Sequence, residues 1–225
     1  MNYEIAIDLT KANFDFYAGG GFLKPDKTYD RKDAPNIFPI FEEAGYTVAR
    51  GYNDYKAKSK DAGKMILIQE EGKDPSCLPY AIDRKSDDLT LAQITESAID
   101  FLTKGKNKGF FLMVEGSQLD DYGHFNDIDL LMQETHDFDR TIGRIFEWAA
   151  QDGETLVVVT ADHETGGLTL VDGDLNEGRI VCKFSTGGHS GVMVPVYAFG
   201  PGAENFTGIF ENTDIFWKIK KLLNL

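Results

Sequence analysis

The sequence Leu156-Val157-Val158-Val159-Thr160-Ala161-Asp162-His163 joins an apolar, β-branched run to a carboxylate and an imidazole. A run of this kind is typical of a buried parallel strand. In open α/β sheets, ligands bind at the carboxyl ends of such strands. A second predicted strand, residues 110–114, is followed in the same way by acidic residues and His124. The two stretches predict acidic residues and histidines at one edge of one sheet, an arrangement that indicates metal chemistry.

Predicted helices and strands alternate along the rest of the chain. We expect helices at 3–13, 37–44, 91–104 and 127–150 and after Asn212; strands at 14–18, 46–49, 65–68, 110–114, 156–159 and 192–199; and weaker β segments at 168–171 and 179–184. The helix at 127–150 is indicated by apolar residues that recur at spacings of three and four. This alternation favours a doubly wound, mostly parallel sheet with flanking helices. The length of the chain fits a single α/β domain over residues 1–225.

The charge of the chain limits its partners. With 23 basic and 37 acidic residues, the net charge is −14, which argues against nucleic acid or an anionic membrane. An anionic substrate would need positive charge that the sequence does not encode, and bound cations would supply it. No apolar run reaches the roughly 20 residues of a membrane-spanning helix, and no signal-type segment opens the chain. Cys77 and Cys182 are too few for a disulfide framework, so the residues alone predict no compartment.

The four histidines of the chain fall into two groups. His136 lies on the polar face of the predicted helix at 127–150, where a solvated side chain is expected. His124, His163 and His189 are predicted in loops, each beside glycine or aspartate, and a single loop histidine is usually solvated as well. Here, however, Asp120 precedes His124 by four residues, Asp162 precedes His163, and a glycine-rich loop carries His189. Imidazoles and carboxylates around an open position suit catalytic zinc.

Two further stretches have competing interpretations. Glu115 has no neighbouring histidine, so it is either a ligand in an all-oxygen magnesium site or an exposed loop carboxylate. Gly19-Gly20-Gly21 is not followed by Gly-Lys-Ser or Gly-Lys-Thr, which favours a backbone turn over a phosphate-binding loop.

Several stretches together resemble the motifs of the alkaline phosphatase family. They are 114–124, which contains Glu115, Asp120 and His124; Thr160-Ala161-Asp162-His163; 189–203, which begins His189-Ser190-Gly191; Asn212-Thr213-Asp214-Ile215; and the glycine turn at 18–21. The resemblance runs from about Tyr3 to the C-terminus and implies the fold of that family. It implies that Asp120, His124 and His189 hold a first zinc, that Asp162 and His163 hold a second, and that Glu115 binds magnesium.

The resemblance also implies hydrolysis of phosphate monoesters. In the family a serine activated by zinc attacks the phosphate and forms a phosphoseryl intermediate. No Asp-Ser-Ala nucleophile motif occurs in this sequence, and the phosphate-clamping arginine and further second-zinc and magnesium ligands have no counterpart. No catalytic residue is therefore assigned, and only the C-terminal portion of the family pattern is matched. Asp121 also stands where the family often has a basic or aromatic residue.

Two hypotheses about function follow. The chain is either the metal-binding C-terminal part of an alkaline phosphatase, with little activity by itself, or a non-catalytic metal-binding remnant or interaction module with the same fold. The Thr-Ala-Asp-His and His-Ser-Gly runs make a related sulfatase or phosphomutase the weaker alternative. The expected partners are a phosphate monoester and either a second copy of the chain or the missing N-terminal half. The resemblance implies a periplasmic or secreted protein.

Overall fold

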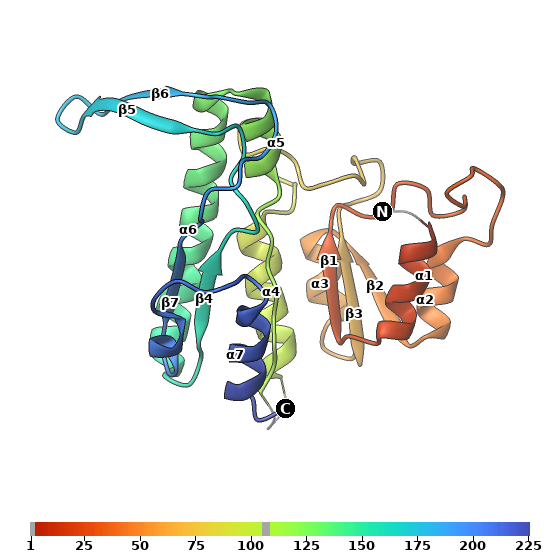
Figure 1. Ribbon diagram of the computed structural model, residues 1–225. Helices are drawn as coiled ribbons and strands as arrows, with labels where there is room; N and C mark the ends of the chain where they lie inside the picture. The colour runs from red at the N-terminus through yellow and green to blue at the C-terminus, as the bar shows by residue number, and fades with distance from the viewer. Residues whose placement is uncertain (1–2, 105–108) are drawn as a thin grey trace. The chain divides into compact units, whose positions relative to one another are not determined.

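The computed structural model describes residues 3–104 and 109–225, which fall into two compact units divided between Glu115 and Gly116 (Figure 1). The first unit contains α1 (Tyr3–Ala12), β1 (Phe16–Gly19), α2 (Ile37–Glu43), β2 (Tyr46–Arg50), α3 (Gly51–Lys58), β3 (Lys64–Ile68) and α4 (Leu91–Thr103). The second contains α5 (Gln118–Phe125), α6 (Ile128–Asp152), β4 (Val157–Thr160), β5 (Thr169–Asp174), β6 (Arg179–Lys183), β7 (Val196–Phe199), the 3-10 helix η1 (Ala203–Phe206) and α7 (Asp214–Leu222).

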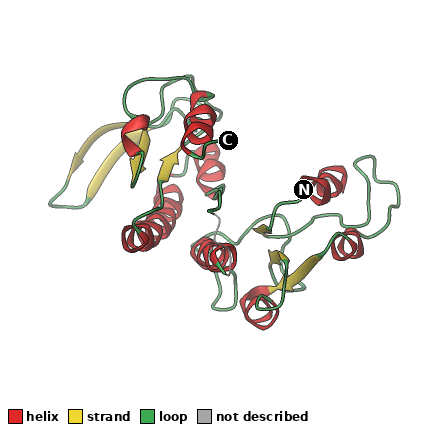
Figure 2. Ribbon diagram, turned by 90° about the horizontal axis from the view of Figure 1, so that it is seen from below, coloured by secondary structure: helices red, strands yellow, loops and turns green. Residues whose placement is uncertain are grey.

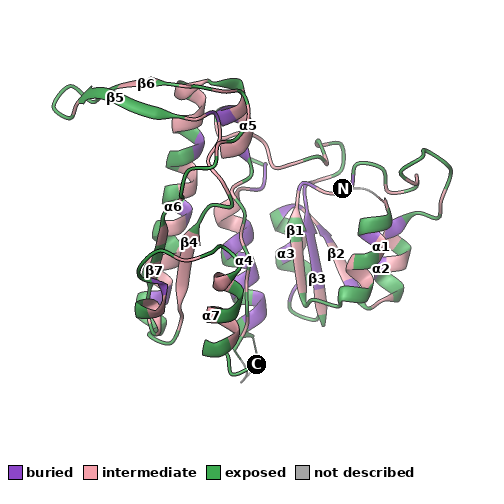
Figure 3. Cartoon of the chain, in the orientation of Figure 1, coloured by how far each residue is buried: buried purple, intermediate pink, exposed green. Residues whose placement is uncertain are grey.

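The first unit is built on a parallel sheet of strand order β1-β3-β2 with helices on both faces (Figure 2). Successive side chains of a strand point to opposite faces, and β3 shows this directly. Met65 and Leu67 pack in one core cluster with residues of α3 and α4, whereas Ile66 and Ile68 pack in another with residues of α1 and α2. All four side chains are buried, and β3 forms the buried centre of this unit in Figure 3. These contacts confirm the predicted α/β fold with a parallel sheet between helices.

The second unit is organised around the long helix α6. The Asp127 side chain accepts a hydrogen bond from the Leu130 amide (3.1 Å), which satisfies an otherwise free donor of the first turn. Gly153 ends the helix with φ +73°, a left-handed conformation that glycine adopts without strain. The prediction of a helix at 127–150 is thus confirmed.

The apolar run at 156–159 forms a strand as predicted, but the prediction of parallel pairing is wrong. Strand β4 pairs antiparallel with β7, with Val157 opposite Phe199 and Thr160 opposite Val196. The strand is also half-buried rather than buried, and Thr160 is exposed. The apolar, β-branched run thus indicated a strand, but neither its full burial nor the direction of its partner. The predicted strand at 192–199 is also shorter than expected, because Pro195 has no N–H to donate to a ladder.

The predicted strand at 110–114 is not a strand in the structure. The segment alternates as a strand would: Phe110 and Leu112 pack against a core cluster of the first unit, whereas Phe111 and Met113 are 63% and 75% exposed. A strand also requires a hydrogen-bonded neighbour, and among the described residues no strand pairs with this segment. The expected meeting of two strand ends at one sheet edge is therefore wrong.

Strands β5 and β6 form an antiparallel hairpin, as the two weaker β segments predicted. Most of the hairpin is exposed (Figure 3), including Leu170, Leu175 and Ile180. Its base is closed by backbone hydrogen bonds from Ser185 N to Gly166 O (2.9 Å) and from Gly166 N to Gly188 O (2.8 Å). Among the described residues, no helix combines the length and apolar character needed to cross a membrane.

Candidate metal centre

Helix α5 carries the first two candidate ligands, Asp120 and His124. Residues four apart lie on the same face of a helix, so both side chains point in the same direction. Acidic residues in its first turn favour the helix, and Asn126 ends it with φ +57°. The prediction that His124 lies in a loop is wrong. The spacing of four was itself a helical signal, but this helix has only eight residues and contains Gly123.

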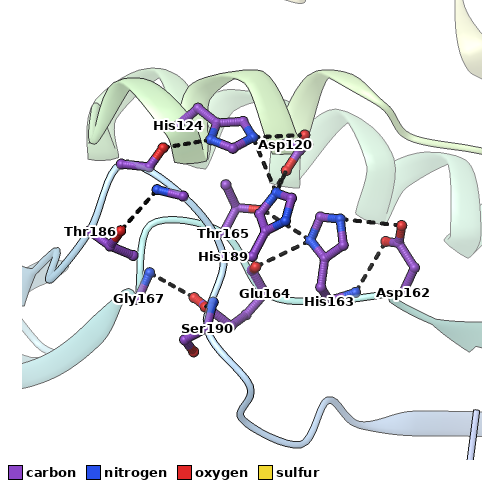
Figure 4. A network of polar contacts seen from close by, with 12 residues as sticks. Asp120, His124, Asp162, His163, Glu164, Thr165, Gly167, Thr186, His189 and Ser190 are labelled. Atoms are coloured by element: carbon purple, nitrogen blue, oxygen red, sulfur yellow. Dashed lines mark hydrogen bonds and ion pairs between the residues drawn. The ribbon is translucent and has the colours of Figure 1, made fainter.

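His189 meets this pair from the loop between β6 and β7 (Figure 4). His189 Nε2 lies 3.2 Å from His124 Nε2 and 3.4 Å from Asp120 Oδ1, and His124 Nε2 lies 3.3 Å from Asp120 Oδ2. A tetrahedral zinc with bonds of about 2.0 to 2.1 Å separates its ligand atoms by about 3.3 to 3.4 Å. The two contacts to Asp120 involve different carboxylate oxygens. With one ligand atom for each residue, the three atoms lie within 4.8 Å of one another, close enough to converge on one metal ion.

Backbone carbonyls fix the orientation of two of the imidazoles. His124 Nδ1 lies 2.8 Å from Gly187 O, and His163 Nδ1 lies 3.2 Å from Glu164 O. A carbonyl oxygen only accepts, so Nδ1 carries the hydrogen in each neutral ring and Nε2 keeps its lone pair. Hydrogen bonds of this kind orient metal-binding histidines in known sites.

The second candidate pair, Asp162 and His163, lies beside the first site. The His163 ring stacks on His189 with a centroid separation of 3.5 Å and an interplanar angle of 22°. His163 Nε2 lies 3.3 Å from Asp162 Oδ2, and the Asp162 side chain is 88% exposed. The structure thus brings five of the six predicted residues together within the second unit. The sixth, Glu115, is exposed and belongs to the first unit.

Thr165 joins the two pairs, although no motif around it predicted this contact. Its hydroxyl donates a hydrogen bond to Asp120 Oδ1. Its methyl group faces α5 at Gly123, where an added Cβ would lie 2.8 Å from Thr165 Cβ and 2.9 Å from Cγ2. Glycine at position 123 therefore allows the loop that carries His163 to approach the helix that carries Asp120 and His124.

The pKa of Asp120 is lower than that of an ordinary aspartate. Burial is the largest single influence and raises the pKa, but the hydrogen bond from Thr165 and the positive charge that His124, His189 and His163 carry when protonated together outweigh it. The carboxylate is therefore ionised at neutral pH and available as an oxygen ligand. By contrast, His136 is exposed on α6, as predicted for a solvated histidine.

Comparison with known proteins identifies the family. The sequence model of the family described as alkaline phosphatase matches residues 5–181. The chain belongs to the alkaline phosphatase family. It is 32% identical to alkaline phosphatase 3 of Bacillus subtilis over 95% of this chain and 59% of that protein. A solved structure of an alkaline phosphatase from the Antarctic bacterium TAB5 matches with a TM-score of 0.84 and 39% identity, over 98% of this chain and 64% of that one.

The chain is thus shorter than the alkaline phosphatases that it matches. A cold-active enzyme from a psychrophilic Shewanella, 27% identical with a TM-score of 0.77, is likewise covered over only 68% of its length. Alkaline phosphatases bind zinc and magnesium, and a variant of the TAB5 enzyme is described with Mg bound in its M3 site. The Asp120, His124 and His189 group matches this chemistry in its donor atoms.

Proposed function

We propose that this chain is the C-terminal, metal-binding part of an alkaline phosphatase and that Asp120, His124 and His189 hold its first zinc. The observation that carries this proposal is that one ligand atom from each residue lies within 4.8 Å of the others, although the residues come from two separate segments of the chain. A carboxylate and two imidazoles around one open position form a donor set suited to catalytic zinc.

We further propose that Asp162 and His163 hold a second, weaker zinc and that Glu115 binds magnesium, with both units acting as one domain over residues 1–225. Two protein ligands give a less complete zinc site than three, so the affinities should differ clearly.

The proposed reaction of the parent enzyme is hydrolysis of a phosphate monoester. Zinc, when bound, supplies a Lewis acid for phosphoryl transfer. The residues of this chain are arranged to bind the metal. Asp120 is ionised, and backbone carbonyls hold the His124 and His163 rings in the tautomer whose Nε2 lone pair is free to bind a metal ion. Because the chain carries a net charge of −14, bound cations would also offset its repulsion of an anionic substrate.

Zinc titration by calorimetry tests the site. We expect one tight event and at most one much weaker event, with the tight event lost in His189→Ala. The control is His136→Ala, which removes an exposed imidazole from the same unit and should leave both events unchanged. Absence of a tight event in the unmodified chain would refute the proposed site. Two equally tight events would show that a further side chain completes the second site.

We expect the chain by itself to hydrolyse p-nitrophenyl phosphate very slowly, even with zinc and magnesium added. The 225 residues contain no Asp-Ser-Ala motif, and loss of a covalent step and of substrate positioning lowers the rate by several orders of magnitude. Turnover at the level of the family, abolished by His189→Ala, would show that a different nucleophile operates here. Turnover that appears only when the missing N-terminal half is added would support the proposal.

A non-catalytic metal-binding remnant or interaction module is the second candidate, and exposed apolar surface favours it. Side chains that are more than half exposed include Phe111, Met113, Tyr197, Phe216 and Trp217. Surfaces of this kind favour contact with another chain, either a second copy or the missing half of the family pattern. Light scattering tests whether this apolar surface contacts another chain. Self-association or binding of the other half would support such contact, whereas a monomer that binds neither a second copy nor the other half would contradict it. The periplasmic or secreted location stays a prediction from the family.

A further inference from the structure

We propose that Glu164 is a positioning residue that holds the loop of His189 in place, and this inference rests on the proposed zinc site. Glu164 follows His163 in the sequence, but its side chain points toward the loop between β6 and β7 (Figure 4). Glu164 Oε2 accepts a hydrogen bond from Gly167 N (2.7 Å), and Oε1 accepts one from Ser190 N. Ser190 is the residue directly after His189, so the carboxylate fixes the backbone at the candidate ligand.

The residue before His189 is fixed by the same turn. Gly188 O accepts a hydrogen bond from Gly166 N (2.8 Å), so the 164–167 turn holds the backbone on both sides of His189. The contact to Ser190 is made by the Glu164 side chain, whereas the contact to Gly188 is made by backbone atoms alone. Mutation can therefore remove the Glu164 contact without changing the backbone of either segment.

The loop needs such a contact because its sequence supplies little rigidity. His189 has Gly187 and Gly188 before it and Gly191 two residues after it. Glycine has more backbone freedom to lose on ordering than any other residue. A carboxylate that accepts two backbone hydrogen bonds offsets part of that entropy and places the His189 imidazole beside His124 and Asp120.

Both oxygens of Glu164 are engaged with backbone amides, so the role we assign is indirect. Glutamine at this position offers one acceptor oxygen to two N–H donors and turns its own NH2 group toward the other donor. Alanine removes both acceptors. Both variants should therefore loosen His189 while leaving Asp120 and His124 on α5.

The first test measures zinc affinity by competition with a chromophoric chelator. Mutations of residues that orient metal ligands typically lower affinity by about 10- to 100-fold, and we expect a loss in that range for Glu164→Gln and Glu164→Ala. The control is Glu154→Gln, an exposed glutamate of the same unit, because it removes the same single negative charge. An equal loss in the control would show that net charge alone is responsible, and this would overturn the inference.

A double-mutant cycle shows whether Glu164 acts through His189. Contacting residues that act as a unit are non-additive. In the His189→Ala background, Glu164→Ala should cause no further loss of the weak residual zinc affinity that Asp120 and His124 retain. A further loss of the same size as in the unmodified chain would show that Glu164 is a direct ligand or acts elsewhere, and the inference would be wrong.

Amide hydrogen exchange on the metal-free chain tests the inference independently of zinc. Ser190 N and Gly167 N should exchange slowly in the unmodified chain and in Glu154→Gln. Both amides should exchange at least tenfold faster in Glu164→Ala, and at least one of them should do so in Glu164→Gln. If the unmodified chain bound no zinc, the proposed function would fail. Faster amide exchange in the Glu164 variants would still support the role of Glu164 in ordering the loop. Equally fast exchange of the two amides in all variants would overturn the inference whatever the zinc titration gives.

Discussion

Substitution of Gly123 by alanine tests whether close approach of Thr165 to α5 builds the metal centre. Two effects oppose each other. Alanine is favoured over glycine within a helix by about 0.8 to 1.0 kcal/mol. The new Cβ would, however, lie 2.8 Å from Thr165 Cβ, where ordinary contact begins at 3.4 Å. Thr165 must therefore retreat by about 0.6 Å, and its Cβ is attached to the backbone and cannot rotate away.

Overpacking of this kind typically lowers stability by about 1 to 3 kcal/mol, which exceeds the helix preference through most of its range. We expect Gly123→Ala to be neutral or destabilising by up to about 2 kcal/mol. The matched control is Gly143→Ala in α6, where an added Cβ meets nothing within 4 Å. Only the helix preference applies there, so this variant should be more stable by about 1 kcal/mol.

Tryptophan fluorescence during urea unfolding measures both variants. The two tryptophans, Trp148 and Trp217, lie in the second unit, so the signal follows the unit that contains the site. Gly123→Ala should also weaken zinc binding, since displacement of Thr165 removes its hydrogen bond to Asp120. Equal stabilisation by the two substitutions, with zinc affinity unchanged, would refute the reasoning.

Three further predictions concern single side chains. Thr165→Val should lower zinc affinity because it keeps the shape but removes the hydroxyl that binds Asp120, whereas Thr165→Ser should retain most of it; equal affinities by chelator competition would argue against this. The pKa of Asp88 is held below its usual value by hydrogen bonds from the Lys73 ammonium, 2.7 Å away, and from a backbone amide. The ionised Asp88 carboxylate therefore stabilises the fold above about pH 4, and this stabilisation is lost as the pH falls through the folded-state pKa. Asp88→Asn should therefore destabilise the chain at pH 7 and differ less from the unmodified chain at pH 3, as measured by urea unfolding with circular dichroism; a constant difference would contradict the assignment. Ser97→Ala should leave stability unchanged or raise it, because the buried Ser97 hydroxyl makes no hydrogen bond among the described residues; a loss above about 1 kcal/mol in the same unfolding experiment would contradict this.

Elements whose burial is periodic along the sequence could be predicted from it. Residues Ile94, Ala98, Phe101 and Leu102 mark the buried face of α4. The apolar repeat of α6 also predicted a helix, although Ala149 is the one apolar residue of α6 that is fully buried. Helix α5 was missed because it has only two turns and packs through Gly123 against Thr165, more than 40 residues further along the chain. The direction of β4 likewise depends on β7, a distant partner that the run at 156–159 does not specify.

In the candidate site, too, local sequence predicted the residues, whereas contacts between distant residues could not be predicted. Asp120, His124, Asp162, His163 and His189 could be selected because their residue types and spacing suit metal binding. The contacts that arrange them could not be predicted, because Glu164 and Thr165 act on Ser190 and Asp120, which are 26 and 45 positions away. Their side chains carry no motif of their own, so only the folded chain reveals their roles.

Because its base is closed, the β5–β6 hairpin should tolerate changes in its length without disturbing the segments that it connects. Backbone hydrogen bonds join Gly166 to Ser185 and Gly188, so the ends of the excursion stay together whatever lies between them. Each doubling of the length of a flexible loop adds only about 0.6 kcal/mol of closure entropy. Insertions at the exposed tip around Leu175 should therefore be tolerated. The same tip offers an attachment point for a fluorophore or a tether, separated by the length of the hairpin from the histidine cluster.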